Sequence, residues 1–115
     1  MTIESGIPDI NPAIQNELNL ITAAIKANTK PESIYLFGSY VNGVPNSDSD
    51  IDIYVVVPDS ELDTIELNAK IRTDLSIKKM MPIDLLIGKK SVFENRKHRL
   101  TLENVIANEG VKIYG

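Results

Sequence analysis

Three aspartates have the type and spacing that metal-dependent chemistry requires. Asp50 and Asp52 stand two residues apart in DIDIYVVV, the segment 50–57, which reads as a β-strand. Because side chains alternate along a strand, both carboxylates leave one face and Ile51 and Ile53 point to the other. Two neighbouring carboxylates destabilise each other unless a cation lies between them. Oxygen ligands without nearby cysteine or histidine favour Mg²⁺, with Mn²⁺ as the alternative.

Asp84 repeats this pattern in IDLLIG, the segment 83–88. The alternation places Asp84 on the face opposite Ile83 and Leu85. If the two strands are neighbours, three carboxylates cluster on one face of a sheet. Such a cluster can hold two ions about 3.5–4 Å apart, one to activate an attacking hydroxyl and one to stabilise a pyrophosphate leaving group. We therefore expect all three aspartates to be metal ligands and catalytic residues.

A glycine and a serine follow another apolar segment, SIYLF at 33–37, which also reads as a strand. Gly38 lets the backbone approach a ligand closely, and Ser39 opens a short helical turn. Free N–H groups at the start of a helix attract phosphate. Gly38 and Ser39 are therefore the predicted phosphate-binding residues.

Helical periodicity on both sides of these segments predicts the elements that position them. A first helix is expected to start at Asn11 and Pro12 and to stop before Pro31. Its apolar stripe is Ile14, Leu18, Ile21 and Ile25. A second long helix is expected over 59–80, capped by Asp59 or Ser60. Its predicted apolar face is ragged: Leu62, Ile65, Ala69 and Leu75.

The C-terminal part predicts two further helices, over 91–98 and 100–110, and an edge strand over 111–114. Helix, strand, strand, helix, strand and then helices is an order typical of an α+β fold. We expect a small mixed β-sheet with helices packed on one face, formed by residues 1–115 as a single domain.

The composition indicates which binding partners and which cellular compartment are compatible with this chain. The chain has no cysteine, which excludes disulfides and Cys-ligated metal centres. Its net charge of -4 disfavours a duplex nucleic acid as partner, because such binding needs a basic surface. Neither a signal peptide nor a membrane-spanning segment is indicated. We therefore expect a cytoplasmic protein, with the number of assembled chains left open.

The quoted motifs carry a resemblance to a known superfamily. GSYVNGVPNSDSDID, residues 38–52, resembles the glycine-serine, spacer, Asp-x-Asp signature of the DNA polymerase beta nucleotidyltransferases, and PIDLLI at 82–87 resembles their third-aspartate strand. The short chain is similar to the minimal nucleotidyltransferases. This resemblance implies the nucleotidyltransferase fold, Mg²⁺ bound by Asp50 and Asp52, and ATP as substrate. It further implies that Asp84 completes the site and draws a proton from the acceptor, and that Gly38 and Ser39 are nucleotide-binding residues that hold the triphosphate. Many members carry arginine where this chain has Asn42.

The same resemblance implies the acceptor and the biological role. Minimal nucleotidyltransferases act as antitoxins that transfer AMP to a tyrosine of a HEPN-type toxin on a separate chain. The Arg–His signature of such a toxin is missing here, since Arg96 is the nearest arginine before His98. Two alternatives stay open: a non-catalytic nucleotide-binding antitoxin that masks its partner, and a stand-alone enzyme for a small molecule or an RNA end. The basic run 96–99 reads as a solvated face.

Overall fold

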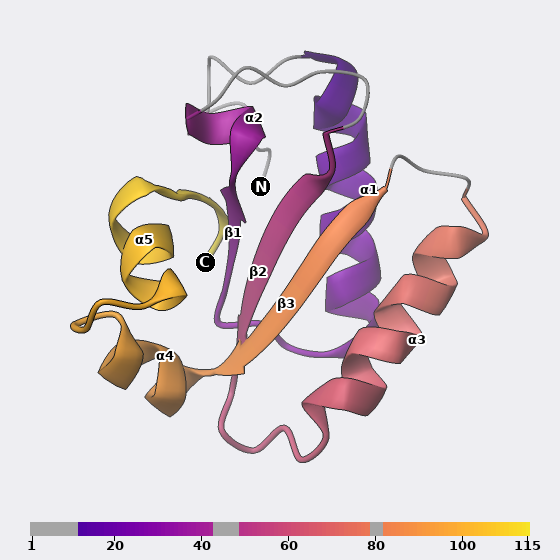
Figure 1. The fold of residues 1–115 in the computed structure, drawn as a ribbon. Helices are drawn as coiled ribbons and strands as arrows, with labels where there is room; N and C mark the ends of the chain where they lie inside the picture. The colour runs from indigo at the N-terminus through magenta and orange to yellow at the C-terminus, as the bar shows by residue number, and fades with distance from the viewer. Residues whose placement is uncertain (1–11, 43–48, 79–81) are drawn as a thin grey trace.

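The computed structural model describes residues 12–42, 49–78 and 82–115, and its centre is a four-stranded mixed sheet (Figure 1). The strands are β1 (Ser33–Phe37), β2 (Ile51–Val57), β3 (Ile83–Lys89) and β4 (Val111–Tyr114). Their order across the sheet is β3-β2-β1-β4. β1 pairs antiparallel with β2 and with β4, whereas β2 and β3 are parallel. The α+β class, the mixed sheet and the C-terminal edge strand are confirmed.

Two long helices, α1 (Pro12–Asn28) and α3 (Thr64–Ser76), cover one face of the sheet (Figure 1). The predicted stripe of α1 is confirmed, since each of its four residues is at most 2% exposed. These side chains meet the apolar residues that alternate along β2. The members of β2 in this core are Ile51, Ile53, Val55 and Val57. Asn11, the predicted cap of α1, lies outside the described residues.

The start and the apolar face of α3 differ from the prediction. Asp63 caps the helix, because its side chain accepts a hydrogen bond from the Glu66 backbone N–H. Asp59 instead accepts a bond from the backbone N–H of Ser91. Of the predicted apolar face, only Leu75 is buried, and Ala69 is exposed. The buried residues of α3 are Leu67, Ile71 and Leu75, whereas Leu62 and Ile65 are 90% and 83% exposed.

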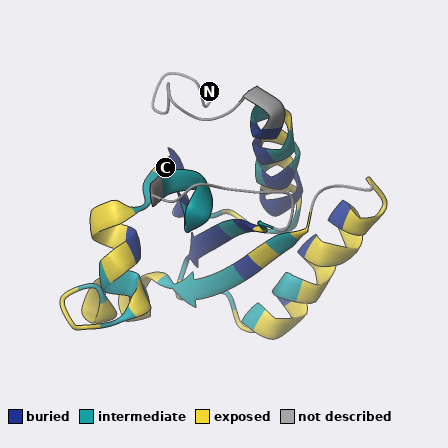
Figure 2. Ribbon diagram, turned by 45° about the horizontal axis from the view of Figure 1, so that its top comes forward, coloured by how far each residue is buried: buried dark blue, intermediate teal, exposed yellow. Residues whose placement is uncertain are grey.

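The other face of the sheet carries two short helices, α4 (Lys90–Arg96) and α5 (Leu102–Glu109). They match the two predicted C-terminal helices, and Gly110 ends α5 as expected. A second, smaller core fills the space beneath them: Tyr54, Val56, Phe93 and Ile106. Helices therefore lie on both faces, rather than on one face as predicted, because β2 has apolar side chains on both sides. Figure 2 shows that most of the remaining residues of α3 and α4 are exposed to solvent.

A turn with a glycine follows β1. Gly38 leads into α2 (Ser39–Asn42), a single short helix above the end of the sheet where β2 and β3 begin (Figure 1). Within the described ranges, none of the helices combines the length and apolar character needed to cross a bilayer.

Candidate active site

The parallel pairing of β2 and β3 brings two of the predicted aspartates together. Asp52 and Asp84 are direct partners in the register, as are Tyr54 and Leu86. Paired residues of neighbouring strands lie about 4.8 Å apart along the hydrogen-bonding direction and project from the same face. Both aspartates stand near the beginnings of their strands, where α4 and α5 do not cover the sheet (Figure 1). The polar side chains thus share the uncovered part of the sheet.

The electrostatic environment of Asp52 depends on the other two aspartates. Burial raises the pKa of Asp52 above its ordinary value of 3.8, and the charges of Asp84 and Asp50 raise it further. Asp50 lies one residue before β2 and is exposed, as is Asp84, whereas Asp52 is half-buried. Asp52 is therefore the carboxylate on which burial and both neighbouring negative charges act together. Bound positive charge at this place would stabilise its ionised form.

Gly38 forms the wall of the site beside Asp52. Its φ of +81° lies in the left-handed region, which residues with a Cβ rarely adopt. A Cβ at this position would overlap the Asp52 carboxylate. Phe37, the residue before it, is the register partner of Asp52 across β1 and β2. The turn thus brings bare backbone against the most buried of the three aspartates.

Ser39 begins α2 directly after this glycine, at the position predicted for it. The turn closes with a hydrogen bond from the Val41 N–H to the Gly38 carbonyl, 3.0 Å long. Tyr40 packs with Val41 against the core under α1 and α3. Residues 43–48, which join α2 to the aspartates, lie outside the described residues, and so does the side chain of Asn42.

The donor set fits a magnesium ion that is completed by other ligands. In the described part of the chain, no three His, Cys, Asp or Glu side chains form a group that could hold a metal by itself. Magnesium sites that serve nucleotide chemistry use one or two carboxylates, with substrate phosphates and water as the other ligands. Asp52 and Asp84 in register, with Asp50 nearby, supply hard oxygen ligands of this kind. The carboxylates therefore fit magnesium together with a triphosphate, rather than a closed protein cage.

Tyr54 lies on the face that carries Asp52, one alternation further along β2, and it packs rather than lining the site. It is 3% exposed, and its ring lies 5.4 Å from that of Phe93 between centroids. The hydroxyl donates a 3.0 Å hydrogen bond to Glu103, which also accepts one from Arg96. Burial, followed by the bond to Glu103, raises the pKa of Tyr54. This network fastens α4 and α5 to β2 next to the site.

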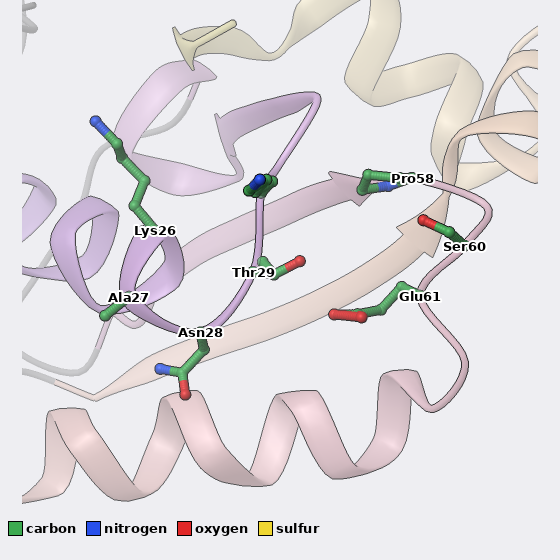
Figure 3. Close-up of a pocket in the computed structure, with 8 residues that line it drawn as sticks. Lys26, Ala27, Asn28, Thr29, Pro58, Ser60 and Glu61 are labelled. Carbon is green, nitrogen blue, oxygen red and sulfur yellow. The ribbon is translucent and has the colours of Figure 1, made fainter.

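A separate hollow of about 430 Å³ lies at the opposite end of β2 (Figure 3). It is lined by the end of α1 and the turn after it, and by the segment after β2. Lys26, Asn28, Ser60 and Glu61 are among the residues around it. Since Pro58 begins this segment, the length of β2 separates the hollow from Asp52. It does not belong to the aspartate site.

Several residues beside the site were not identified from the sequence. Phe37 and Glu103 are examples, and so are Asn68 and Arg72 of α3, whose side chains reach β3. A polar residue beside a buried helical position, such as Asn68 after Leu67, is a weak signal for such a contact. The basic run agrees with a solvated face: its residues are half-buried or exposed, and Arg96 and Lys97 pair with Glu103 and Glu94.

A mixed four-stranded sheet with flanking helices and aspartates on adjacent strands is consistent with a nucleotidyltransferase fold. The family model described as polymerase beta, nucleotidyltransferase matches residues 19–115, and the chain therefore belongs to this family. The matched range includes Gly38, Ser39 and all three aspartates. Membership makes the chain a transferase of nucleotidyl groups in general. A search among curated proteins gave no significant match.

Proposed function

We propose that the chain is a magnesium-dependent adenylyltransferase that moves AMP from ATP to a hydroxyl group. The observation that carries the proposal is the direct register of Asp52 with Asp84, with the Gly38 backbone packed against Asp52. Carboxylates on adjacent strands beside a glycine turn can hold metal and phosphate within one small volume. The choice of ATP and of magnesium rests on the resemblance of the motifs at 38–52 and 82–87.

Each candidate residue has a defined role in this proposal. Asp50 and Asp52 are the ligands for magnesium, and Asp84 completes the set. Gly38 and Ser39 bind the β- and γ-phosphates through backbone N–H groups and the serine hydroxyl. Bound magnesium supplies positive charge next to the triphosphate. The acceptor oxygen forms a bond to the α-phosphorus, while the bond from that phosphorus to the bridging oxygen breaks and pyrophosphate leaves. The proton of the acceptor hydroxyl passes to the Asp84 carboxylate.

The proposed acceptor is a tyrosine hydroxyl of a HEPN-type toxin on a separate chain, which makes this protein an antitoxin. The proposal rests on the resemblance to minimal nucleotidyltransferases and on the position of the aspartates. Asp84 is exposed and Asp52 half-buried on the part of the sheet that α4 and α5 leave uncovered. A side chain of another protein can therefore approach the carboxylates directly. Such an open site suits a macromolecular acceptor better than an enclosed pocket would.

A second candidate function is neutralisation of the same partner by masking, with the nucleotide site silent. One observation favours it. Asn42 stands where many family members carry arginine, which removes one positive charge from the loop proposed to bind phosphate.

Transfer of label separates the two functions. The protein is incubated with α-³²P-labelled ATP, Mg²⁺ and the co-expressed toxin encoded beside it, and label on the toxin is measured. Adenylyl transfer predicts label that requires Mg²⁺ and is lost on Asp50→Asn or Asp52→Asn. Glu61→Gln, which changes an acidic residue at the far end of β2, is the matched control and should leave the labelling intact.

The result that would overturn the enzymatic proposal is equally concrete. If wild type adds no label, and Asp50→Asn binds and neutralises the toxin as well as wild type does, the masking function replaces it. Transfer of the γ-phosphate instead of the α-phosphate, seen as label on the toxin from γ-labelled ATP, would also contradict adenylyl transfer. The bond that breaks would then be the one between the β- and γ-phosphates.

A further inference from the structure

Asp84 stands at a place where a strand is least constrained. β3 is one of the two edge strands of the described sheet, the other being β4, and its neighbour is β2. Asp84 is the second residue of β3, close to the end at which the strand begins. Edge strands lack a partner for half of their backbone groups, and the ends of elements open first. Some other contact has to fix Asp84 opposite Asp52 if the two carboxylates are to act together.

Two side chains of α3 supply such a contact on the outer edge of β3. Asn68 donates a 2.8 Å hydrogen bond from Nδ2 to the carbonyl of Leu85, the residue after Asp84. Arg72 lies one helical turn further on, and its Nη1 is 3.5 Å from the carbonyl of Ile83, the residue before Asp84. This second contact is long for a hydrogen bond, so Asn68 makes the stronger link.

Arg72 also orients Asn68. Its Nε donates a 2.7 Å hydrogen bond to Oδ1 of Asn68. An amide whose oxygen accepts from a guanidinium turns its NH₂ group the other way, which here is towards β3. The four-residue spacing puts both side chains on one side of α3, next to the buried stripe of Leu67, Ile71 and Leu75. The contact thus depends on a fixed pair, anchored by the core beneath it.

The carbonyls that accept these contacts flank Asp84 on both sides. Successive carbonyls of a strand point to opposite edges, so those of Ile83 and Leu85 face α3 while the backbone of Asp84 faces β2. On the β2 side, the Ile51 N–H donates to the Pro82 carbonyl over 3.1 Å, and the register pairs Asp84 with Asp52. The peptide groups around Asp84 are therefore attached both to the sheet and to α3.

We propose that Asn68 and Arg72 are positioning residues that hold Asp84 in register with Asp52. Together they form the Asn68–Arg72 brace, which acts through the backbone of β3 and does not touch substrate. The inference rests on the proposed function for its effect on catalysis, because Asp84 is there the residue that takes the acceptor proton. Displacements of about 1 Å by residues remote from the chemistry can slow catalysis about 100-fold.

Asn68→Leu is the principal test, since it removes the amide and keeps a similar volume in a helix. We expect the turnover number for label transfer to fall about 10- to 100-fold, with the KM for ATP within about threefold of wild type. Arg72→Met, which leaves Asn68 in place, should have a smaller effect of the same kind. Lys70→Leu is the matched control on α3, because Lys70 pairs with Glu66 of the same helix rather than with β3.

Amide hydrogen exchange gives a readout that does not depend on activity. In Asn68→Leu, the amides of Asp84 and Leu86 should exchange roughly tenfold faster, since one hydrogen bond is worth about that factor in an opening equilibrium. Amides of β1, such as that of Leu36, should exchange as in wild type. A uniform acceleration throughout the sheet would mean general destabilisation and would overturn the inference.

A double-mutant cycle decides whether the brace acts through Asp84. If it does, Asn68→Leu has little further effect on the residual rate of Asp84→Asn, because the group it positions is already absent. Independent, multiplying effects would contradict the inference, as would β3 exchange and turnover equal to those of Lys70→Leu. If wild type shows no transfer at all, the proposed function fails, and the exchange experiment still accepts or rejects the brace.

Discussion

The two faces of strand β2 differ in what they contribute. Ile51, Ile53, Val55 and Val57 face α1 and α3, and each is 0% exposed. The residues between them face the other way, and they change along the strand from the half-buried Asp52 to Tyr54 and Val56, which are 3% and 2% exposed. The face towards α1 and α3 therefore contributes buried apolar side chains along the whole length of β2. The opposite face contributes them only beneath α4 and α5, so charged groups can lie at the beginning of the strand.

The largest expected effect on stability comes from the face of β2 that packs against α1 and α3. Ile53→Ala should lower the free energy of unfolding by about 2–5 kcal/mol, because it removes a fully buried side chain and leaves a cavity. Urea denaturation followed by circular dichroism measures this loss. Ile65→Ala makes the same chemical change at a position that is 83% exposed, and it should shift stability by less than about 0.5 kcal/mol. Equal losses would contradict the division between core and surface.

Gly38→Ala tests the close contact between Gly38 and Asp52 at the beginning of β2. We expect a loss of about 1–3 kcal/mol, since alanine at a φ of +81° is strained and its Cβ would overlap the Asp52 carboxylate. Thermal and urea denaturation give the value. In an Asp52→Ala background the overlap disappears and the backbone strain remains, so the loss should be smaller there. The same loss in both backgrounds would show that the two residues are not in contact.

Tyr54→Phe tests the part of β2 that lies beneath α4 and α5. The variant keeps the ring on Phe93 and loses the hydrogen bond to Glu103, at a cost of about 1 kcal/mol. Burial alone would raise the pKa of Glu103, but the bonds from Arg96 and Tyr54 outweigh it and lower the pKa below 4.5. Stability from a lowered pKa is present above the ordinary value and is lost as the pH falls. The difference between variant and wild type should therefore shrink below pH 4.5.

The smallest effect has the opposite sign. Without Mg²⁺ at pH 7, Asp52→Asn should stabilise the protein by at most about 1 kcal/mol, because it removes a charge that burial and two aspartates disfavour. A group with a raised pKa contributes stability below its ordinary value and loses it as the pH rises. The advantage of the variant should therefore vanish below pH 3.8, where the wild-type carboxyl is protonated. Thermal melting curves of the variant and the wild type across this pH range test the prediction. A variant that is less stable than wild type at pH 7 would contradict it.

Local patterns predicted the helices and strands, but not every boundary. The stripe of α1 and the alternation in β2 depend on neighbouring residues, so the sequence contains them. The cap of α3 does not, because Asp59 is satisfied by Ser91, which lies far along the chain. α3 starts at Thr64, five residues after the predicted start, so Leu62 lies outside the helix. Within α3, Leu67 and Ile71 are buried instead of Ile65.

The arrangement of the site needed the structure for a similar reason. A helix joins β2 to β3, so no tight turn sets their register, and the pairing of Asp52 with Asp84 does not follow from spacing alone. The helices on the second face could not be assigned either, since Tyr54 and Val56 suit a covered face as well as a site. Contacts such as that of Asn68 with Leu85 depend on how α3 lies against the edge of the sheet.

The space above Gly88 has a consequence for how this protein can vary. A Cβ on residue 88 would overlap the hydroxyl of Tyr54, which reaches across from the neighbouring strand to Glu103. A larger residue at 88 therefore requires a shorter one at 54, and such a pair would release Glu103 from β2. A larger residue at 88 should therefore be tolerated better together with a shorter residue at 54 than alone, whereas a shorter residue at 54 requires no change at 88.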